Sequence, residues 1–225
     1  MAASERPPGA HPPTEQYLEA LLVLEGEGVE VIQARLAERV GHSAPTVSEM
    51  VRRLKEAGYV NTRGRVLSLT SAGRQLATSV LRKHCLVGRL MTDVIGLPWC
   101  QAHAEADRWE HVISDEVEAR LVEVLGNPTT CPHGNPIPGT SARPGRTALL
   151  ADAEIGQRVC LARVLDVAKL DMEALAYLDK HHCIPGCQAT VTARDPDGSL
   201  VLKIGDSTIG LGASIAKLLC VTPAG

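Results

Sequence analysis

Residues 103 to 111 concentrate the side chains with the clearest chemistry in this chain. They read His-Ala-Glu-Ala-Asp-Arg-Trp-Glu-His. Positions i, i+4, i+7 and i+8 of a helix share one face, which would here carry two imidazoles and two carboxylates: His103, Asp107, Glu110 and His111. Neighbouring carboxylates repel each other, and a divalent cation removes that repulsion. Oxygen and imidazole donors suit manganese and ferrous iron, so the spacing predicts a metal site.

Spacing alone leaves two other interpretations of this face open. A solvated acidic helix can carry histidines that bind nothing. A di-iron carboxylate bundle would use the same residue types, but it is disfavoured because it requires a Glu-x-x-His pair on each of two helices.

A basic block precedes the acidic segment. Residues 43 to 90 include nine Lys or Arg and two acids, whereas residues 101 to 125 include seven acids and two Arg. This split predicts a polyanionic partner for the first block and cations for the second.

Helix, turn, helix and hairpin follow one another across residues 14 to 70. Apolar residues at helical spacing predict helices over 17–24 and 31–40, with Thr14 as the N-cap of the first. Ser43 is the expected N-cap of a third helix that ends at Gly58, and 59–70 predicts two strands around a Gly/Arg turn. This order is that of a winged helix-turn-helix.

The third helix is the predicted DNA-reading element, because a recognition helix places its N-terminal residues in the major groove. The residues expected to contact DNA are Ser43, Ala44, Pro45, Thr46, Ser48, Glu49 and, on phosphate, Arg53. Winged helices also serve as protein-interaction modules, but the basic block favours DNA.

The remaining pattern predicts helices and then strands. We expect one helix over 71–94 and one or two helices over 99–125, interrupted near Ser114. Five prolines between 127 and 145 predict a linker or a wrapping segment. Residues 148–225 predict a small β-barrel with a short helix near 173–178.

Composition limits the class of protein. The chain has 225 residues, 44% hydrophobic and 22% charged, as soluble globular proteins have. No apolar run approaches the roughly 20 residues that span a bilayer, and residues 1–13 lack the apolar core of a signal peptide. We therefore expect a cytoplasmic protein with no membrane partner, whose seven cysteines are thiols.

Two rival functions would use the same residue types. A metalloenzyme needs an open coordination position and a general base, and the sequence offers no nucleophile elbow or phosphate loop, so we expect no enzyme. A zinc-dependent interaction protein would draw on Cys131-Pro132-His133, or on His181-His182-Cys183 with Cys187.

Longer motifs extend from these residues along the chain. They are Arg82-Lys83-His84, Asp93-Val94-Ile95-Gly96-Leu97, Arg108-Trp109-Glu110-His111, Asn135-Pro136-Ile137-Pro138-Gly139 and the helix start Ser43-Ala44-Pro45-Thr46-Val47-Ser48. Together they resemble the diphtheria toxin repressor and iron-dependent regulator family from about residue 14 to 139. Beyond 139 only the β-rich pattern and its position match the family's SH3-like domain.

The resemblance implies a metal-dependent transcriptional repressor that controls metal homeostasis genes. In this family metal activates a homodimer, or two dimers per operator, to bind palindromic operator DNA. The implied ligands of up to two sites per subunit are Gln16, Glu19, His84, His103, Asp107, Glu110 and His111. Asp171 and Glu173 are further candidates from the third domain.

Two ligand positions depart from the iron-type pattern. Gln16 and Asp107 stand where iron-type members have Met and Cys, and oxygen in place of sulfur makes the site harder. Mn²⁺ is therefore expected ahead of Fe²⁺. Glu49 replaces the family's usual Gln, and because a carboxylate only accepts hydrogen bonds, we expect a shifted operator preference.

The predicted fold class is mainly α with a β-rich C-terminal domain. We expect a flexible tail over 1–13, a winged helix-turn-helix over 14–73 and a helical metal-binding and dimerisation domain over 74–139. A linker over 140–148 would lead to an SH3-like small β-barrel over 149–225.

Overall fold

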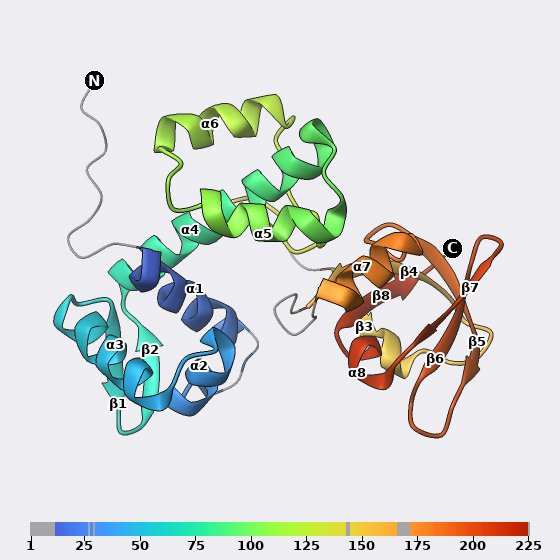
Figure 1. Ribbon diagram of the computed structural model, residues 1–225, viewed down its shortest axis with the longest axis horizontal. Coiled ribbons are helices and arrows are strands. Elements are labelled where there is room, and N and C mark those ends of the chain that lie inside the picture. The colour runs from blue at the N-terminus through green and yellow to red at the C-terminus, as the bar shows by residue number, and fades with distance from the viewer. Residues whose placement is uncertain (1–11, 27, 29, 143–144, 166–171, 225) are drawn as a thin grey trace. The chain divides into compact units, whose positions relative to one another are not determined.

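The computed structural model describes residues 12–26, 28, 30–142, 145–165 and 172–224 (Figure 1). Contacts divide the chain into two compact units. The first contains the described residues up to Val87 together with Ala106–Val124, and the second contains Gly88–Glu105 with Leu125 and the residues beyond it. The predicted domain boundaries stay a prediction.

Three helices and a hairpin form the DNA-reading part of the first unit. Helices α1 (Pro12–Gly26), α2 (Gln33–Val40) and α3 (Ala44–Glu56) precede strands β1 (Val60–Arg63) and β2 (Val66–Leu69), which pair antiparallel. Their apolar faces meet in one core, whose fully buried members include Tyr17, Leu18, Leu21, Leu36 and Leu54. The predicted order of helix, turn, helix and wing is confirmed.

Two predicted helix starts in this unit are wrong. Thr14 lies buried inside α1, which already includes Pro12 and Pro13, so Thr14 is not its N-cap. The second helix begins at Gln33, because Val31 accepts a backbone hydrogen bond from Leu67 at 2.8 Å and Ile32 forms a β-bridge with Val66. Strand-like pairing with the wing therefore overrides helical spacing at these two residues.

The start of α3 follows the predicted capping. Gly41 ends α2 with φ 68°, a left-handed conformation that favours glycine. Ser43 then accepts a hydrogen bond from the Thr46 N–H at 3.4 Å through its Oγ, and Pro45 lies in the first turn. The sequence thus fixes where the exposed end of α3 begins.

Helix α4 (Ser71–Arg89) is shorter than predicted. A π-helical turn, η1 (Leu90–Ile95), continues it and ends at Gly96, whose φ is 77°. The Thr92 hydroxyl donates to the Gly88 carbonyl at 3.2 Å and reaches that of Arg89 at 3.4 Å. Such bonding by a threonine side chain to the preceding turn favours a departure from regular α geometry here.

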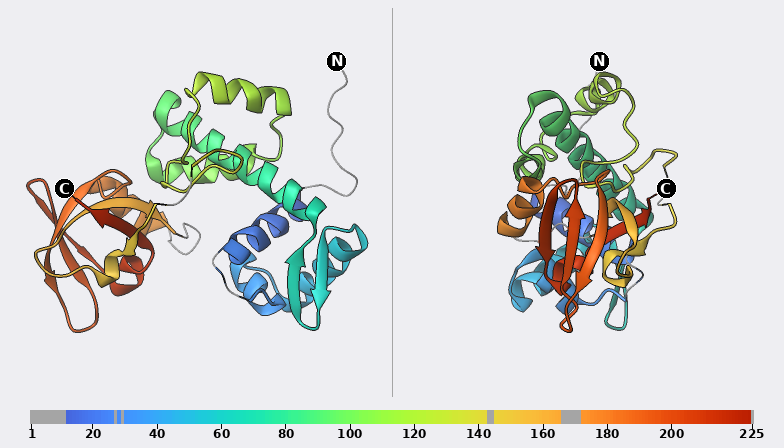
Figure 2. Two further views of the ribbon diagram at one scale, coloured as in Figure 1. Left: turned by 180° about the vertical axis from the view of Figure 1, so that it is seen from behind. Right: turned by 90° about the vertical axis from the view of Figure 1, so that its right-hand side faces the viewer.

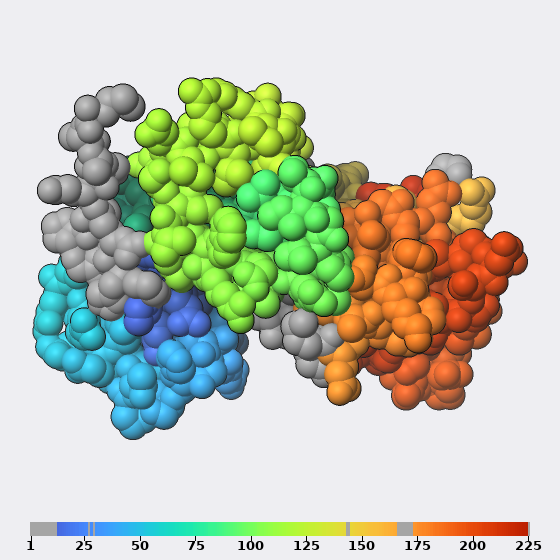
Figure 3. Space-filling view, turned by 45° about the horizontal axis from the view of Figure 1, so that its top comes forward, coloured from blue at the N-terminus to red at the C-terminus, as the bar shows by residue number. Residues whose placement is uncertain are grey.

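Two helices follow, as the sequence predicts. These are α5 (Trp99–Trp109) and α6 (Asp115–Val124), and between them Ser114 accepts a hydrogen bond from the Val117 N–H at 3.2 Å. In the first unit α6 is held to α4 by Arg82–Glu118 at 2.7 Å and Lys83–Asp115 at 2.9 Å. Its outer face forms part of the molecular surface in Figure 3.

A six-stranded antiparallel sheet forms most of the second unit. Its strand order is β3-β8-β4-β5-β6-β7, and β5, β6 and β7 lie side by side in Figure 2. The strands are β3 (Ala148–Leu149), β4 (Arg158–Val164), β5 (Gln188–Arg194), β6 (Leu200–Ile204), β7 (Ser207–Leu211) and β8 (Leu219–Pro223). The predicted short helix is α7 (Met172–Lys180), and short turns η2 (Leu150–Asp152) and α8 (Ala213–Ala216) complete the unit.

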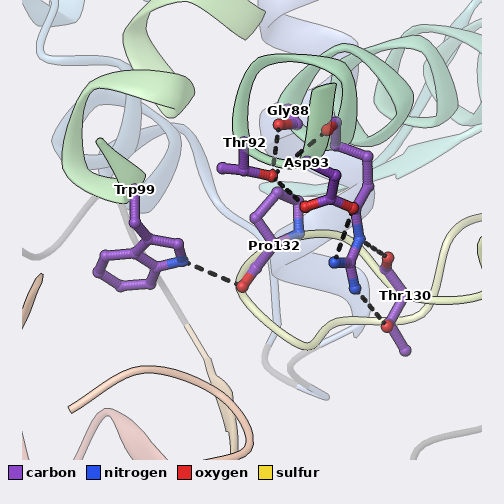
Figure 4. Close-up of polar contacts among 7 residues, drawn as sticks. Gly88, Thr92, Asp93, Trp99, Thr130 and Pro132 are labelled. Carbon is purple, nitrogen blue, oxygen red and sulfur yellow. Dashed lines mark hydrogen bonds and ion pairs between the residues drawn. The ribbon is translucent and has the colours of Figure 1, made fainter. Parts of the chain in front are cut away.

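The proline-rich segment wraps the start of this unit. The Arg89 guanidinium donates to the Thr130 carbonyl at 2.7 Å, and the Trp99 indole N–H donates to the Pro132 carbonyl at 3.0 Å (Figure 4). Trp99 also belongs to the core that the sheet forms. The wrapping alternative is thus confirmed for these residues. Among the described residues, no helix is long and apolar enough to cross a membrane.

Candidate metal centre

Ionisable side chains from three elements of the first unit converge on one point. Helix α1 contributes Glu15 and Glu19, which stand at i, i+4 and so share a face. Helix α4 contributes His84, and the turn that follows α5 contributes Glu110 and His111. Among these, Glu15, His84 and Glu110 are at most 8% exposed.

Glu110 connects the two imidazoles. Its Oε2 lies 2.7 Å from Nδ1 of His84, and its Oε1 lies 3.3 Å from Nε2 of His111. The opposite nitrogen of His111, Nδ1, lies 2.6 Å from Oε2 of Glu15. A continuous polar chain therefore runs from α1 to α4 through the end of α5.

Asp107 lies at the edge of this chain. Its Oδ1 is 3.3 Å from Nδ1 of His84, while its side chain remains 57% exposed. Residues 107, 110 and 111 thus meet the same cluster, as the helical spacing predicted, even though α5 ends at Trp109. The Glu110 N–H still donates to the Ala106 carbonyl at 3.0 Å, so the helical backbone continues as far as Glu110. This continuation directs the Glu110 side chain towards His84.

Glu19 completes a set of metal-type ligands. One ligand atom from each of Glu19, His84 and Glu110 lies within 4.8 Å of the others. Burial, with the negative charge of Glu110 added, raises the pKa of Glu19 to about 7. A carboxyl group in this position is stabilised only by a proton or by a positive charge.

Both imidazoles favour their charged forms. Burial disfavours the imidazolium of His84, but hydrogen bonds to Asp107 and Glu110 outweigh it and raise the pKa of His84 well above its usual range. For His111, the hydrogen bond to Glu15 is the largest cause of a raised pKa. The site therefore places two imidazoles that favour the charged form, those of His84 and His111, next to its carboxylates.

The exposed start of α3 presents the predicted DNA-reading residues. Ser43, Ala44, Pro45, Thr46, Ser48, Glu49 and Arg53 are all exposed, while Val47 and Met50 point into the core. Figure 3 shows this part of the first unit, drawn in cyan, at the surface. Their contact with DNA stays a prediction.

Glu49 is not an isolated acceptor on this face. The Arg52 guanidinium donates to both of its oxygens, at 2.6 and 3.0 Å, and also to Glu56 at 2.5 Å. The hydrogen bond from Arg52 is the largest cause of a lowered pKa of Glu49. Glu49 is thus oriented along the helix by its own neighbour.

Comparison with known proteins agrees with these features. The model of the iron-dependent repressor N-terminal DNA-binding domain matches residues 11–66, and the model of the metal-binding and dimerisation domain matches residues 70–139. The iron-dependent repressor IdeR of Mycobacterium leprae is 41% identical over 203 residues, which are 85% of this chain and 88% of the relative. This chain belongs to the iron-dependent repressor family.

Further matches extend the similarity over most of the chain. The diphtheria toxin repressor of Corynebacterium diphtheriae is 40% identical over 216 residues, which cover 92% of this chain and 95% of the relative. A FeoA domain model matches residues 148–223. A solved manganese-dependent transcriptional repressor in complex with manganese has a TM-score of 0.80 at 30% identity and covers 94% of this chain and 100% of that one. The predicted fold class, with its β-rich SH3-like third domain, is confirmed.

The described donor set of this family member fits a divalent cation. Glu19 and the buried Glu110, from two elements, each place an oxygen within 4.8 Å of a nitrogen of His84, and burial raises the pKa of Glu19 to about 7, so that a nearby cation would favour its carboxylate form. All the donors are oxygen or nitrogen atoms, which suit manganese and ferrous iron better than soft metals.

Glu15 is the residue that sequence reasoning missed. It is 3% exposed and contacts His111, whereas its neighbour Gln16, the predicted ligand, is exposed. The signal was available, because Glu15 and Glu19 are separated by one helical turn. A ligand role for Gln16 stays a prediction.

The other predicted ligands belong to the second unit or lie outside the described residues. His103 belongs to the second unit, where its ring meets the ring of His133 edge to face at 5.4 Å, and its pairing with His84 stays a prediction. Glu173 is exposed on α7, and Asp171 falls outside the described residues. No cysteine occurs in the metal-type groups found among the described residues, so the zinc alternative gains no support.

The net positive charge that the predicted basic block, residues 43 to 90, can present at the surface is smaller than its count of Lys and Arg suggests. Arg74 pairs with Glu25, Arg82 with Glu118 and Lys83 with Asp115, and all three acids lie outside the block. These cations hold the first unit together instead of adding to the charge of a DNA-facing surface. On α3 and the wing tip, the exposed cationic side chains include Arg53, Lys55, Arg63 and Arg65.

Proposed function

We propose that this chain is a homodimeric, cytoplasmic repressor whose binding to operator DNA is activated by a divalent cation. The observation that carries the proposal is the convergence of Glu19, His84 and Glu110, within 4.8 Å, beside a winged helix-turn-helix. Membership of the iron-dependent repressor family supports the same function.

Glu19, His84 and Glu110 would hold the cation. His111 would add a second imidazole through its contact with Glu110, and Asp107 would add a carboxylate through its contact with His84. The bound cation supplies the positive charge that the buried carboxylates lack. Because this set contains no sulfur, Mn²⁺ is the first choice and Fe²⁺ the second. Gln16 and His103 remain candidate ligands, the latter in a second site.

Helix α1 links these ligands to the DNA-reading elements. It carries Glu19, and the Tyr17 hydroxyl on the same helix meets Nδ1 of His42 at 2.7 Å, one residue before the cap of α3. Near the C-terminal end of α1, Glu25 accepts a hydrogen bond from the Leu69 N–H of the wing at 2.9 Å. A ligand that fixes α1 therefore favours one placement of α3 and the wing.

DNA recognition would follow from the exposed end of α3. Ser43, Thr46 and Ser48 offer hydroxyls, Ala44 and Pro45 offer apolar contacts, and Glu49 accepts from a base amino group. Arg53 would contact phosphate. In a homodimer two such helices would read half-sites about 34 Å apart.

A titration of metal against DNA binding tests the proposal. Operator DNA is first selected from a random duplex library with manganese present, and affinity is then measured by fluorescence anisotropy with Mn²⁺, Fe²⁺, Zn²⁺ or a chelator. We expect Mn²⁺ and Fe²⁺ to raise the affinity and His84→Ala to remove the increase. His182→Ala, which changes an exposed histidine of the second unit, is the matched control. Equal affinity with and without metal would overturn the proposal.

A further inference from the structure

Three charged side chains are joined along the exposed face of α3. The Arg52 guanidinium donates to Glu49 through two nitrogens, from Nε to Oε2 at 3.0 Å and from Nη2 to Oε1 at 2.6 Å. Its third nitrogen, Nη1, donates to Oε1 of Glu56 at 2.5 Å. The three side chains are between 56 and 60% exposed, so this Glu-Arg-Glu row lies at the surface of the first unit.

Helical spacing places the row on the face that begins at the N-terminal end of α3. Residues three or four positions apart follow one stripe of a helix. This stripe consists of Pro45, Glu49, Arg52 and Glu56. The opposite face is buried and consists of Val47, Met50, Val51 and Leu54. A groove that receives the start of α3 therefore also meets Glu49 and Arg52.

The charge of the row does not suit general attraction to DNA. Two carboxylates and one guanidinium leave one net negative charge, whereas DNA carries a negative charge for about every 1.7 Å of its axis. Arg52 cannot offset the repulsion elsewhere while both carboxylates hold it. The arrangement instead favours hydrogen bonds in fixed directions.

The fork between Arg52 and Glu49 sets these directions. Each oxygen of Glu49 has two lone pairs, and because Arg52 occupies one on each oxygen, each oxygen can accept one more hydrogen bond. Three of the five N–H donors of Arg52 serve the described contacts, which leaves two. Acceptors and donors thus lie next to each other on the stripe. The hydrogen bond from Arg52 also lowers the pKa of Glu49, so its carboxylate stays an acceptor.

A C·G base pair presents the complementary pattern in the major groove. Cytosine donates through N4, and the neighbouring guanine accepts through O6 and N7. A T·A pair differs, because its donor, adenine N6, lies between two acceptors. We propose that Glu49 and Arg52 act together as one reader of a C·G pair, in which Glu49 accepts from cytosine and Arg52 donates to guanine. The inference rests on the proposed operator binding and names the base pair that α3 would select.

A phosphate contact by Arg52 is the alternative, because arginine supplies many contacts to the DNA backbone. Arg52 would then have to leave both carboxylates, and these would face DNA without a counter-charge. A phosphate contact also carries no base preference, and its loss weakens binding to all sequences alike. The two interpretations therefore differ in what a substitution of Arg52 does to the operator consensus.

Selection from a random duplex library, with the full chain and manganese present, tests the inference. We expect wild type to prefer C·G at one position of each half-site by about tenfold, and Arg52→Ala to abolish the preference at that position alone. Glu49→Gln should change the preference at the same position. Arg52→Lys keeps the charge but not the fork, so it should relax this preference while the dependence of affinity on salt stays as in wild type.

Helix α6 offers a matched control. Arg120 pairs with Glu123 at 2.7 Å, also three residues apart and exposed, so Arg120→Ala should keep the wild-type consensus. The preference at one position is compared with that at the others on the same DNA, so a loss of overall affinity in a variant does not hide it.

The outcomes separate this inference from the proposed function. An unchanged consensus for Arg52→Ala, a uniform loss of affinity with a salt dependence reduced by about one phosphate contact, or a wild-type preference for another base pair at the affected position would overturn the reader. In each of these cases metal-dependent operator binding would still stand. Failure of wild type to select any sequence, with or without manganese, would overturn the proposed function and the reader with it.

Discussion

Replacing Glu19 with Gln should stabilise the metal-free protein at neutral and alkaline pH while removing its response to metal. Glu19 lies with Glu110 in the cluster, and burial raises its pKa from the usual 4.5 to about 7. Glutamine keeps the shape of the side chain and carries no charge. The variant therefore removes the cost of ionisation and a metal ligand in one change.

The sign and size follow from linkage. Between pH 4.5 and about 7 the folded state keeps a proton on Glu19 that the unfolded state has lost, so stability falls as pH rises through this window. One pKa unit corresponds to about 1.4 kcal/mol, which gives a loss of about 3 kcal/mol once Glu19 is ionised. The raised pKa of His84 acts in the same direction, because its contribution is present below the usual histidine range and lost at higher pH.

Urea denaturation of metal-free protein at a series of pH values measures this effect. We expect wild type to lose about 2.5 kcal/mol more than Glu19→Gln between pH 5 and pH 8. Manganese at about 100 times its dissociation constant should stabilise wild type at pH 8 by about 2.7 kcal/mol and should stabilise the variant much less. Glu123→Gln, which changes an exposed partner of Arg120, is the matched control and should follow wild type.

The dependence of the free energy of unfolding on pH tests whether Glu19 has a raised pKa in the folded protein. Equal slopes for wild type and Glu19→Gln would refute the claim that Glu19 is held in an unfavourable charged state. A variant that kept the full manganese stabilisation would remove Glu19 from the ligand set.

Three further expectations concern the first unit. Tyr17→Phe, which deletes the hydroxyl that meets His42, should reduce the metal-induced gain in operator affinity several-fold while leaving metal affinity, measured by calorimetry, unchanged; a matching loss of metal affinity would contradict it. Glu49→Gln should change the preferred operator base at one position by about tenfold in selection from random DNA, and an unchanged consensus would contradict a base contact by Glu49. Ser43→Ala should cost about 1 kcal/mol of unfolding free energy through loss of its cap on α3, whereas a cost near zero would show that the cap contributes nothing.

The elements that carry strong local signals could be predicted from the sequence. Ser43, Pro45 and Gly41 fix the ends of the helices around the turn, and the Arg-Gly-Arg turn fixes the wing. The helical spacing of Asp107, Glu110 and His111 placed all three near His84 or Glu15. In each case the controlling interaction lies within a few residues of the pattern.

What could not be predicted depends on contacts between distant residues. Ile32 pairs with Val66 of the wing strand instead of starting a helix. Glu15 and Gln16 are adjacent, so only the rotation of α1 against its neighbours decides which one meets His111. The same holds for Arg82 and Lys83, whose acidic partners on α6 are more than 30 positions away.

The pKa directions in the cluster give one physical account of the sensor. Glu19 retains its proton up to about pH 7, and His84 and His111 both favour their charged forms, so protons supply the positive charge that the carboxylates need. A cation that binds there must displace these protons, and its apparent affinity must therefore rise with pH. Protons and a divalent cation differ, however, in the number of side chains that each can bind at once. A proton neutralises one side chain, whereas a cation bound as we propose would draw Glu19 of α1, His84 of α4 and Glu110 into one coordination sphere. Because α1 also contacts His42 and the wing, only the cation would convert occupancy of the site into a fixed placement of the DNA-reading helix.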